Sequence, residues 1–447
     1  MPKKNARRGP RPLTNPDLRH RSQMPGPEIE EVERRLYALL SPSLLAPRQM
    51  ERRNPKDRGR PIRMRARLLT LPVMMAIIVS LVFRRLSSLT EAQRLLARDG
   101  LLWTSPIQVS KQAINKRLDT MPAAIMGDIF REVCERLRSE PAGELPGRCS
   151  HLEGRFAAIV MVDGSTLEEL GKKTKDLRGV EEPVLGGKIM MMVDAFGLRP
   201  LWQSYTEDSS ANDKRFCQQI LDQVPQGGLL IYDLGFFSFD WFDKSTDQNK
   251  YFVTRMRHKT AYKVVRTLSE GSYYSDQIIE VGKYRSNPCK HHLRMVSVLW
   301  GKSWYRYLTN VLDPEMLSAK DVCDLYRIRW RIEDAFLLTK RVLGLAYLWS
   351  ASSNAVQLQV YATLIFYGVL IQMCRQLATA LQQPLEKISV EMVFRALYYY
   401  STALQRGESQ SLVTFLADNA KLLGLVKMER KRHRQRRHRT ALIWGNR

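Results

Sequence analysis

Four polar side chains on one short stretch have the types and the spacing for phosphate chemistry. We expect residues 325–343 to form one helix, and at about 100° per residue these side chains share an arc of roughly 60°; they are Tyr326, Arg329, Glu333 and Lys340. A carboxylate beside bases and a hydroxyl suits a ligand for a hard cation next to a phosphodiester, because the cation and the bases can both bind phosphate oxygens. A solvated surface helix with an ordinary Arg329–Glu333 ion pair fits the same pattern, so other elements must distinguish the two.

Apolar runs earlier in the chain predict the elements that would position such a site. We expect buried strands at residues 156–162, 188–193, 198–204, 229–232 and 251–257, with a helix at 212–223. Three antiparallel strands followed by a fourth beside the first is the order of a ribonuclease-H-like α/β fold with a mixed five-stranded sheet. The first and fourth strands run parallel in that order. Asp163 and Asp233 would therefore emerge together at one edge, whereas Asp194 would point to the opposite edge.

The composition favours a polyanionic partner. The 447 residues include 71 Lys and Arg against 45 Asp and Glu, a formal net charge of +26, and such an excess points to nucleic acid. The six cysteines form no CxxC pair, which indicates reduced thiols in a reducing compartment. Cys289 with His291 and His292 resembles half of a zinc site, but no matching second pair is evident, so we expect no zinc there.

The sequence does not predict a membrane protein. The N-terminus is basic and has no apolar core of a signal peptide, so we expect a cytoplasmic protein. Two apolar runs, at residues 68–83 and 360–371, fall short of the roughly 20 residues that span a bilayer. We expect buried helices at both.

Changes in composition divide the chain into four expected segments. These are a basic, mostly flexible arm at 1–65, a helical DNA-binding domain at 66–150, a catalytic domain at 151–380 with a β insertion at about 259–310, and C-terminal helices with a basic tail at 381–447.

Two surfaces outside the acidic site have the composition to contact DNA. Residues 108–118 predict a short helix that resembles the recognition helix of a helix-turn-helix, with a plain amphipathic helix as the simpler alternative; its outward polar side chains are Gln112, Asn115, Lys116 and Arg117. The β insertion is basic and contains Trp300 and Trp304. Such aromatic rings either stack on unpaired bases or pack in the interior.

The spacing Tyr-x2-Arg-x3-Glu-x6-Lys that begins at Tyr326 resembles the signature of the DDE transposases of bacterial insertion sequences with the Tyr-Arg-Glu-Lys motif, the insertion-sequence-four group. The segments VDGSTL at 162–167, YDLGFF at 232–237 and YLTNVLD at 307–313 are also similar to that group. The resemblance covers about residues 160–345.

The resemblance implies a metal-dependent phosphoryl transfer on DNA, with Asp163, Asp233 and Glu333 as the catalytic acids and metal ligands. Two Mg²⁺ ions, for which Mn²⁺ can substitute, would be held there with Asp163 between them. The tyrosine, arginine and lysine of the signature would position the phosphate backbone near the cut.

Similar transposases nick the end of their element, use the freed 3′-hydroxyl to cut the second strand through a hairpin, and join the end to target DNA. The resemblance therefore implies double-stranded DNA as the substrate and a homodimer on that DNA. The hairpin step needs an aromatic side chain to hold a flipped base, for which Trp300 and Trp304 are candidates. Two alternatives stay open: a catalytically silent transposase-derived DNA-binding protein, and a ribonuclease-H-like nuclease that cuts without joining.

Overall fold

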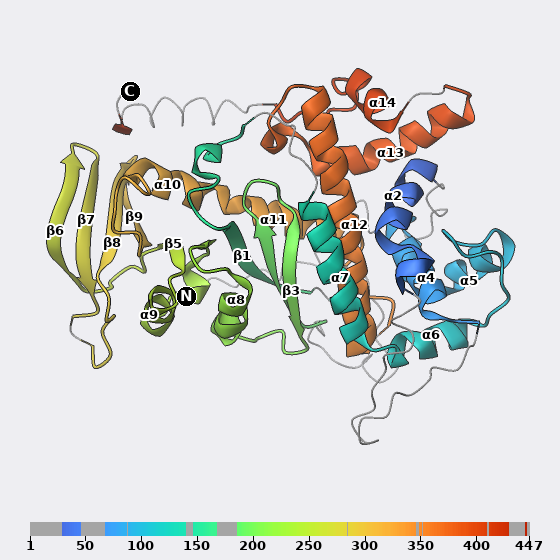
Figure 1. Cartoon of the computed structure of the whole chain (residues 1–447), viewed down its shortest axis with the longest axis horizontal. Helices are drawn as coiled ribbons and strands as arrows, with labels where there is room; N and C mark the ends of the chain where they lie inside the picture. The colour runs from blue at the N-terminus through green and yellow to red at the C-terminus, as the bar shows by residue number, and fades with distance from the viewer. Residues whose placement is uncertain are drawn as a thin grey trace, which may run out of the picture. The chain divides into compact units, whose positions relative to one another are not determined.

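The computed structural model describes residues 29–45, 68–86, 88–139, 146–167, 186–283, 285–345, 348–350, 352–408, 411–428 and 443–444. Most of the predicted basic arm lies outside the described residues, as does the basic C-terminal run beyond Met428. The chain forms two compact units (Figure 1). The first comprises Met1–Ala123 and Thr339–Phe366, and the second comprises Ala124–Leu338 and Tyr367–Arg447. The four segments expected from composition stay a prediction.

Among the described residues, one mixed sheet of nine strands organises the second unit, in the order β3-β2-β1-β4-β5-β9-β8-β7-β6. β1 is antiparallel to β2 and parallel to β4, and β4 is parallel to β5. The strands are β1 (Ile159–Thr166), β2 (Lys188–Asp194), β3 (Pro200–Thr206), β4 (Leu229–Ile231), β5 (Tyr251–Arg255), β6 (Tyr262–Gly271), β7 (Tyr274–Val281), β8 (Leu293–Trp300) and β9 (Ser303–Thr309).

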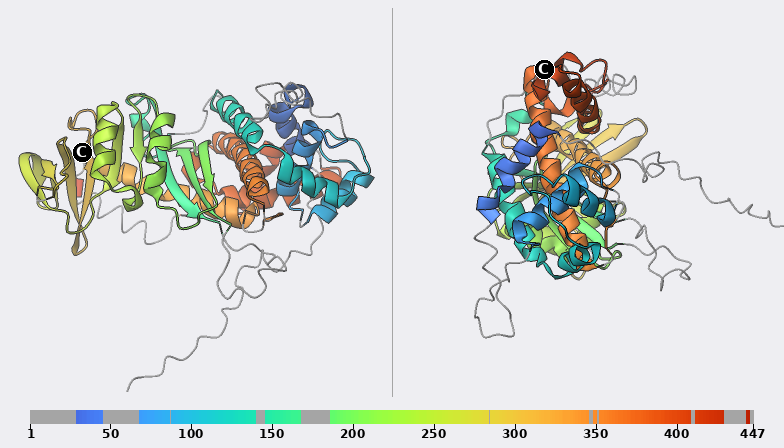
Figure 2. Two further views of the ribbon diagram at one scale, coloured as in Figure 1. Left: turned by 90° about the horizontal axis from the view of Figure 1, so that it is seen from below. Right: turned by 90° about the vertical axis from the view of Figure 1, so that its right-hand side faces the viewer.

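The sheet is larger than the five strands predicted. The strands of the expected insertion, β6 to β9, extend the same sheet instead of forming a separate one, because β9 pairs antiparallel with β5. Without β9, β5 would be an edge strand with unpaired backbone N–H and C=O groups, which this pairing satisfies. Figure 2 shows from a second direction that β6 to β9 continue the sheet.

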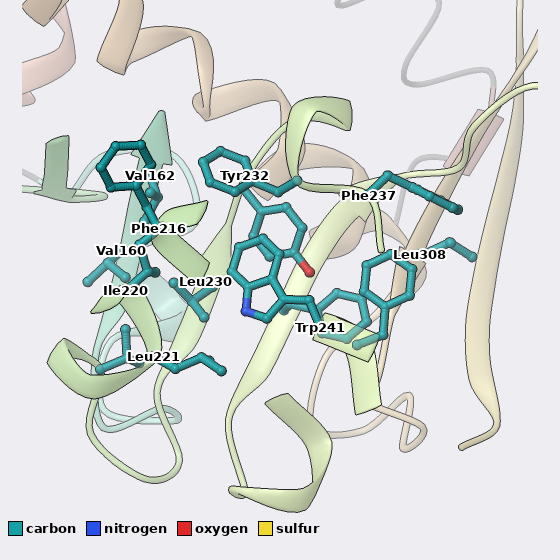
Figure 3. Close-up of a cluster of buried hydrophobic side chains, with 14 of the residues drawn as sticks. Val160, Val162, Phe216, Ile220, Leu221, Leu230, Tyr232, Phe237, Trp241 and Leu308 are labelled. Carbon is teal, nitrogen blue, oxygen red and sulfur yellow. The ribbon is translucent and has the colours of Figure 1, made fainter. Parts of the chain in front are cut away.

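One face of the sheet is buried under two helices. The alternate residues Val160 and Val162 of β1 point into this core, as period-two patterning requires. They meet side chains from α8 (Cys217–Gln223) and α9 (Phe239–Asp247), including Ile220 and Trp241 (Figure 3). Tyr232, directly after β4, stacks on Trp241 with ring centroids 4.2 Å apart. Asp163 and Gly164 follow in the same alternation, so Asp163 faces away from this core.

The second unit contains further helical elements. They are α7 (Ala123–Arg138), η2 (Ser150–Leu152), η4 (Asp213–Phe216), η5 (Leu234–Phe236), α10 (Ala319–Ile328), α11 (Trp330–Leu337), η7 (Leu385–Lys387), α13 (Val390–Gln405) and α14 (Leu412–Asp418). α10 begins at a sequence-encoded cap, since the Ser318 side chain accepts a hydrogen bond from the Asp321 backbone N–H at 3.1 Å.

The first unit is helical. It contains α2 (Glu30–Leu40), α3 (Pro42–Leu45), α4 (Leu71–Phe83), α5 (Leu89–Arg98) and α6 (Lys111–Thr120), together with the π-helical turn η6 (Leu338–Val342), apart from Leu338, and the first part of α12 (Ser353–Ala380). Asn354 of α12 fixes the end of α6, because its Nδ2 donates to the backbone oxygens of Leu118 and Met121, each at 2.7 Å. Ser88 caps the start of α5, because its side chain accepts a hydrogen bond from the Glu91 backbone N–H at 3.3 Å.

Both predicted apolar runs lie in buried helices, α4 and α12. Among the described residues, α12 is one helix long and apolar enough to cross a membrane, but 83% of its most apolar window is buried. Such burial is typical of the core helix of a folded domain.

Candidate active site

The two aspartates lie side by side at matching positions of parallel strands. The register of β1 and β4 pairs Met161 with Ile231. Asp163 and Asp233 each lie two residues after these paired positions, so they are neighbours. Asp163 lies within β1 and not after it, because β1 continues in its pairing with β2. The carboxyl edge of the sheet therefore brings these acids together.

Local turns fix the side chains of Asp233 and Asp194 at the ends of their strands. Asp233 Oδ1 accepts a hydrogen bond from the Gly235 backbone N–H at 2.7 Å and caps η5. Asp194, at the end of the antiparallel strand β2, caps its own turn and pairs with Arg199 at 3.5 Å. Asp194 thus has a local structural role.

Asp163 is crowded by burial and by a second carboxylate. Its side chain is 15% exposed. Burial raises the pKa of Asp163 to about 6, the charge of Asp233 adds to this increase, and Arg329 opposes it. Two neighbouring carboxylates repel each other when both are ionised, and a divalent cation would relieve that repulsion.

The segment that carries Glu333 is not the single helix predicted. α10 and α11 meet at Arg329, and the π-helical turn η6 follows α11. Arg329 keeps helical backbone angles, with φ −48° and ψ −36°, so the four-residue step from Arg329 to Glu333 still places both on one face. A π-helical turn has a wider i→i+5 repeat. Lys340 lies in that turn and in the first unit, so the 100° count does not extend to it.

A buried guanidinium joins α11 to the first aspartate. Arg329 is 5% exposed; its Nη1 donates to Asp163 Oδ2 at 3.0 Å and its Nη2 donates to Glu333 Oε1 at 2.9 Å. The Arg329–Glu333 pair of the simpler interpretation therefore exists. It is not a solvated surface pair, because the arginine is buried and also bonds an acid 166 residues away in the sequence. The charge of Asp233 also favours the charged form of Arg329. Carboxylates from three elements therefore act on one guanidinium group.

Two aromatic rings flank Arg329. The guanidinium carbon lies 5.8 Å from the ring centroid of Tyr326 and 5.2 Å from that of Trp330. Burial raises the pKa of Tyr326, against the opposing effect of Arg329. Trp330 is 60% exposed, so it presents an open ring beside the acids. Sequence analysis missed Trp330, although a tryptophan next to the arginine of the signature could have indicated it.

The entry into α10 is fixed from within the sheet. Arg294 on β8 is fully buried and donates two hydrogen bonds, of 2.8 and 2.7 Å, to the carboxylate of Asp276 on β7. Its Nη1 also donates to the backbone oxygen of Leu317 at 2.6 Å, directly before the Ser318 cap. The strands of the expected insertion thus anchor the helix that leads to Arg329.

The predicted tryptophans lie in the β8–β9 hairpin of the same unit. Trp304 is 48% exposed. Trp300 contacts Arg327 of α10, whose guanidinium carbon lies 5.3 Å from the ring centroid. Trp300 is therefore tied to the helix before Arg329, whereas Trp304 is available at the surface.

The predicted recognition helix corresponds to α6, in the first unit. The connection from α5 to α6 runs from Asp99 to Ser110, much longer than the 3–4-residue turn of a helix-turn-helix. Of the four predicted side chains, Gln112 and Lys116 are exposed. Asn115 and Arg117 are half-buried. DNA contact by this face stays a prediction.

A further arginine lies beside the acids at the end of β5. The β4–β5 register pairs Ile231 with Val253, so Arg255 comes next to Asp233. Its guanidinium carbon lies 5.1 Å from the ring centroid of Tyr305. The rule that selects the aspartates, the carboxyl end of a parallel strand, would also have selected Arg255.

The acids fit a hard divalent cation. All three offer carboxylate oxygens, the ligands that Mg²⁺ prefers, and the raised pKa of Asp163 records the crowding that a cation would relieve. In the part of the chain that the structure describes, no three His, Cys, Asp or Glu side chains are already gathered as a metal cluster; Arg329 instead lies between Asp163 and Glu333.

Comparisons with known proteins show which family this part of the chain is similar to. Residues 154–368 match the family model described as "Transposase DDE domain". A Sinorhizobium fredii protein named as transposase y4zB is 24% identical over 273 residues, covering 60% of this chain and 72% of that protein. Proteins named as transposases for the insertion sequence elements IS4SA of Synechocystis and IS5377 of Geobacillus stearothermophilus are 24% and 25% identical. Those matches cover 36% and 32% of this chain, and 45% and 38% of the two proteins.

One solved structure, the piggyBac transposase synaptic complex with hairpin DNA, aligns with 92% of this chain and 89% of its own, at a TM-score of 0.41 and 11% sequence identity.

The segment that matches the transposase DDE domain, residues 154–368, therefore contains all three acids. The protein is a DNA transposase, an enzyme that cleaves DNA and transfers the cut strands.

Proposed function

We propose that this protein is the transposase of an insertion sequence of the Tyr-Arg-Glu-Lys group, and that Asp163, Asp233 and Glu333 are its catalytic acids. The observation that carries the proposal is the buried Arg329, which hydrogen bonds two of the acids and joins β1 to α11. We also propose that β1 to β5, with three antiparallel strands and then β4 beside β1, form a ribonuclease-H-like core.

Asp163, Asp233 and Glu333 would hold two divalent cations. Mg²⁺, or Mn²⁺ in its place, would supply activation of the attacking hydroxyl and stabilisation of the leaving oxygen. The protein's own side chains position the DNA. Arg329, held by Asp163 and Glu333, presents its buried charge at the site, and the Tyr326 hydroxyl stays protonated because burial raises its pKa. Lys340 would bind the backbone further along.

Double-stranded DNA at the element ends and at the target is the proposed substrate, bound by a homodimer. The net charge of +26 supports a polyanionic partner. The affinity for DNA should therefore fall as salt rises, in a linear relation between their logarithms. We propose that this charge also associates the protein with the bacterial nucleoid.

Second-strand cleavage through a hairpin requires a ring that holds a flipped base. The sequence-based candidates are Trp300 and Trp304. Trp330 is a third candidate, because it is exposed and lies next to Arg329. Unchanged second-strand cleavage after replacement of all three by Ala would argue against a stacking tryptophan.

The test is cleavage and joining of a labelled DNA fragment that carries the gene's own flanks, with Mg²⁺, comparing wild type with Glu333→Gln. Metal-dependent cuts at fixed ends that vanish in the variant, with strand transfer to a second DNA, are the expected result. Binding without cutting in both proteins would favour the silent DNA-binding alternative. Cutting without joining would favour the nuclease.

A further inference from the structure

A fourth carboxylate lies against the backbone of the acidic site. Asp213 begins η4, which packs against η5, the turn that Asp233 caps. Its side chain is 19% exposed and pairs with Lys188 of β2. Neither residue belongs to the signature or to the acids selected from the sequence.

Two glycines make room for Asp213. A Cβ atom on Gly164 would lie 2.7 Å from Asp213 Oδ1, and a Cβ atom on Gly235 would lie 2.5 Å from Asp213 Oδ2. Real Cβ atoms essentially never approach so closely. Neither glycine has a positive φ among the described residues, so the backbone conformation does not require glycine at either position. At both positions the atom nearest to such a Cβ is a carboxylate oxygen of Asp213, so a side chain there would have to displace that carboxylate.

Each of these glycines donates a backbone hydrogen bond to one of the two aspartates of the site. Gly164 directly follows Asp163 and donates its backbone N–H to Oδ1 of that residue at 2.8 Å. Gly235 donates in the same way to Asp233 Oδ1. A Cβ atom on Gly235 would lie 3.0 Å from Asp233 Oδ1, so the carboxylates of Asp213 and Asp233 flank one α-carbon. Asp213 therefore packs on the backbone that presents each acid.

The charge of Asp213 has one ionic partner and unused acceptor capacity. Lys188 Nζ lies 2.5 Å from Asp213 Oδ1 and donates to the backbone oxygen of Ala211 at 2.8 Å. Asp213 Oδ1 is buried and, in the described structure, accepts no bond of good hydrogen-bond geometry beyond this ion pair. A negative charge and its counter-charge thus lie directly behind the acids.

We propose that Asp213 is a positioning residue of the catalytic centre, which holds the turn that presents Asp233 and, with Lys188, adjusts the affinity of the site for a divalent cation. The inference rests on the proposed function, since it takes Asp163, Asp233 and Glu333 as the metal ligands. Loss of the Asp213 charge weakens the attraction for a cation, and loss of the Lys188 charge strengthens it.

This sign distinguishes the proposal from a merely structural ion pair. Asp213→Asn and Lys188→Met break the same pair, so a structural role predicts that both variants weaken cation binding. An electrostatic role predicts shifts in opposite directions. Asp208→Asn is the matched control, because Asp208 lies just before η4, is exposed and pairs with the exposed Arg215.

The experiment is a titration of the full-length protein with Mn²⁺, in which electron paramagnetic resonance measures the free ion. Asp213→Asn should raise the Kd for Mn²⁺ roughly three- to tenfold, and Lys188→Met should lower it by a similar factor. The control should leave the Kd unchanged. Melting temperatures identify any variant that fails to fold. Lys188→Met retains the Asp213 carboxylate, so weaker Mn²⁺ binding by this variant alone would overturn the proposal.

Glu333→Gln separates this inference from the function on which it rests. Unchanged Mn²⁺ binding in that variant would remove the proposed metal site itself. Weaker binding in Glu333→Gln, combined with shifts of one sign or no shift in the Asp213 and Lys188 variants, would leave the metal site standing and overturn the role of Asp213.

Discussion

Replacement of Asp163 by Asn should stabilise the metal-free protein at neutral pH. The pKa of Asp163 is raised from 3.8 to about 6, chiefly by burial. Because the folded state binds the proton more tightly than the unfolded state, the stabilising effect of protonation is complete below about pH 4 and is lost as the pH rises through 6. At pH 8 the ionised carboxylate therefore costs about 3 kcal/mol of folding free energy.

Asparagine removes this cost and loses part of what the carboxylate does. Asp163 accepts hydrogen bonds from Gly164 N–H at 2.8 Å and from Arg329 at 3.0 Å, whereas an amide offers one oxygen acceptor. The lost bond costs about 1–2 kcal/mol. The net gain at pH 8 should be about 1–2 kcal/mol, or a rise in melting temperature of about 2–6 °C.

Thermal unfolding with a chelator, at pH 8 and at pH 5, measures this gain. The advantage of Asp163→Asn should shrink at pH 5, where most of the wild-type side chain is protonated in the folded state. Asp208→Asn, at an exposed carboxylate, should gain nothing at either pH. A variant less stable than wild type at pH 8 would refute the reasoning, because it would mean that the acids stabilise the fold without a metal.

Three further substitutions test other parts of the site. Arg294→Met should lower the melting temperature sharply, because an unpaired buried charge on Asp276 costs roughly 3–5 kcal/mol; adding Asp276→Leu should restore most of the loss, and no recovery would contradict the ion-pair account. Trp330→Ala should leave first-strand nicking intact and reduce second-strand cleavage, so nicked DNA should accumulate on a denaturing gel; a full level of double-strand breaks would exclude its role. Gly235→Ala should weaken Mn²⁺ binding, because its Cβ atom would lie 2.5 Å from Asp213 Oδ2 and would displace that carboxylate. Unchanged Mn²⁺ binding in this variant would show that crowding at Asp213 does not affect the acids.

The edge of the sheet that carries the acids could be predicted because it follows from strand order. Runs of apolar residues locate β1 and β4, and a parallel pairing brings the residues after them together, whatever the side chains of the neighbouring strands. The four-residue step from Arg329 to Glu333 likewise depends only on helical geometry. These features need no knowledge of distant contacts.

Other features depend on pairings between distant segments and could not be predicted. The sheet has nine strands and not the five expected, because β9 pairs with β5. No local sequence pattern specifies which edge of a sheet a later strand will join. Asp213 lies at the start of the segment predicted as a helix, residues 212–223, and a helical pattern does not specify distant contacts, so only the folded structure shows that Asp213 packs against Gly164 and Gly235. The π-helical turn that contains Lys340 likewise cannot be predicted from a count that assumes 100° per residue.

The energetic cost of Asp163 is the strongest argument against a silent DNA-binding protein. Affinity for DNA requires positive charge, which the chain has in excess, and gains nothing from a carboxylate held in a buried position where its pKa is raised to about 6. A neutral side chain would serve the fold better there. Strained or costly groups of this kind are typical of catalytic sites, where a ligand or the reaction compensates for them. Under the proposed function, a cation held by Asp163 and the two further acids would supply this compensation.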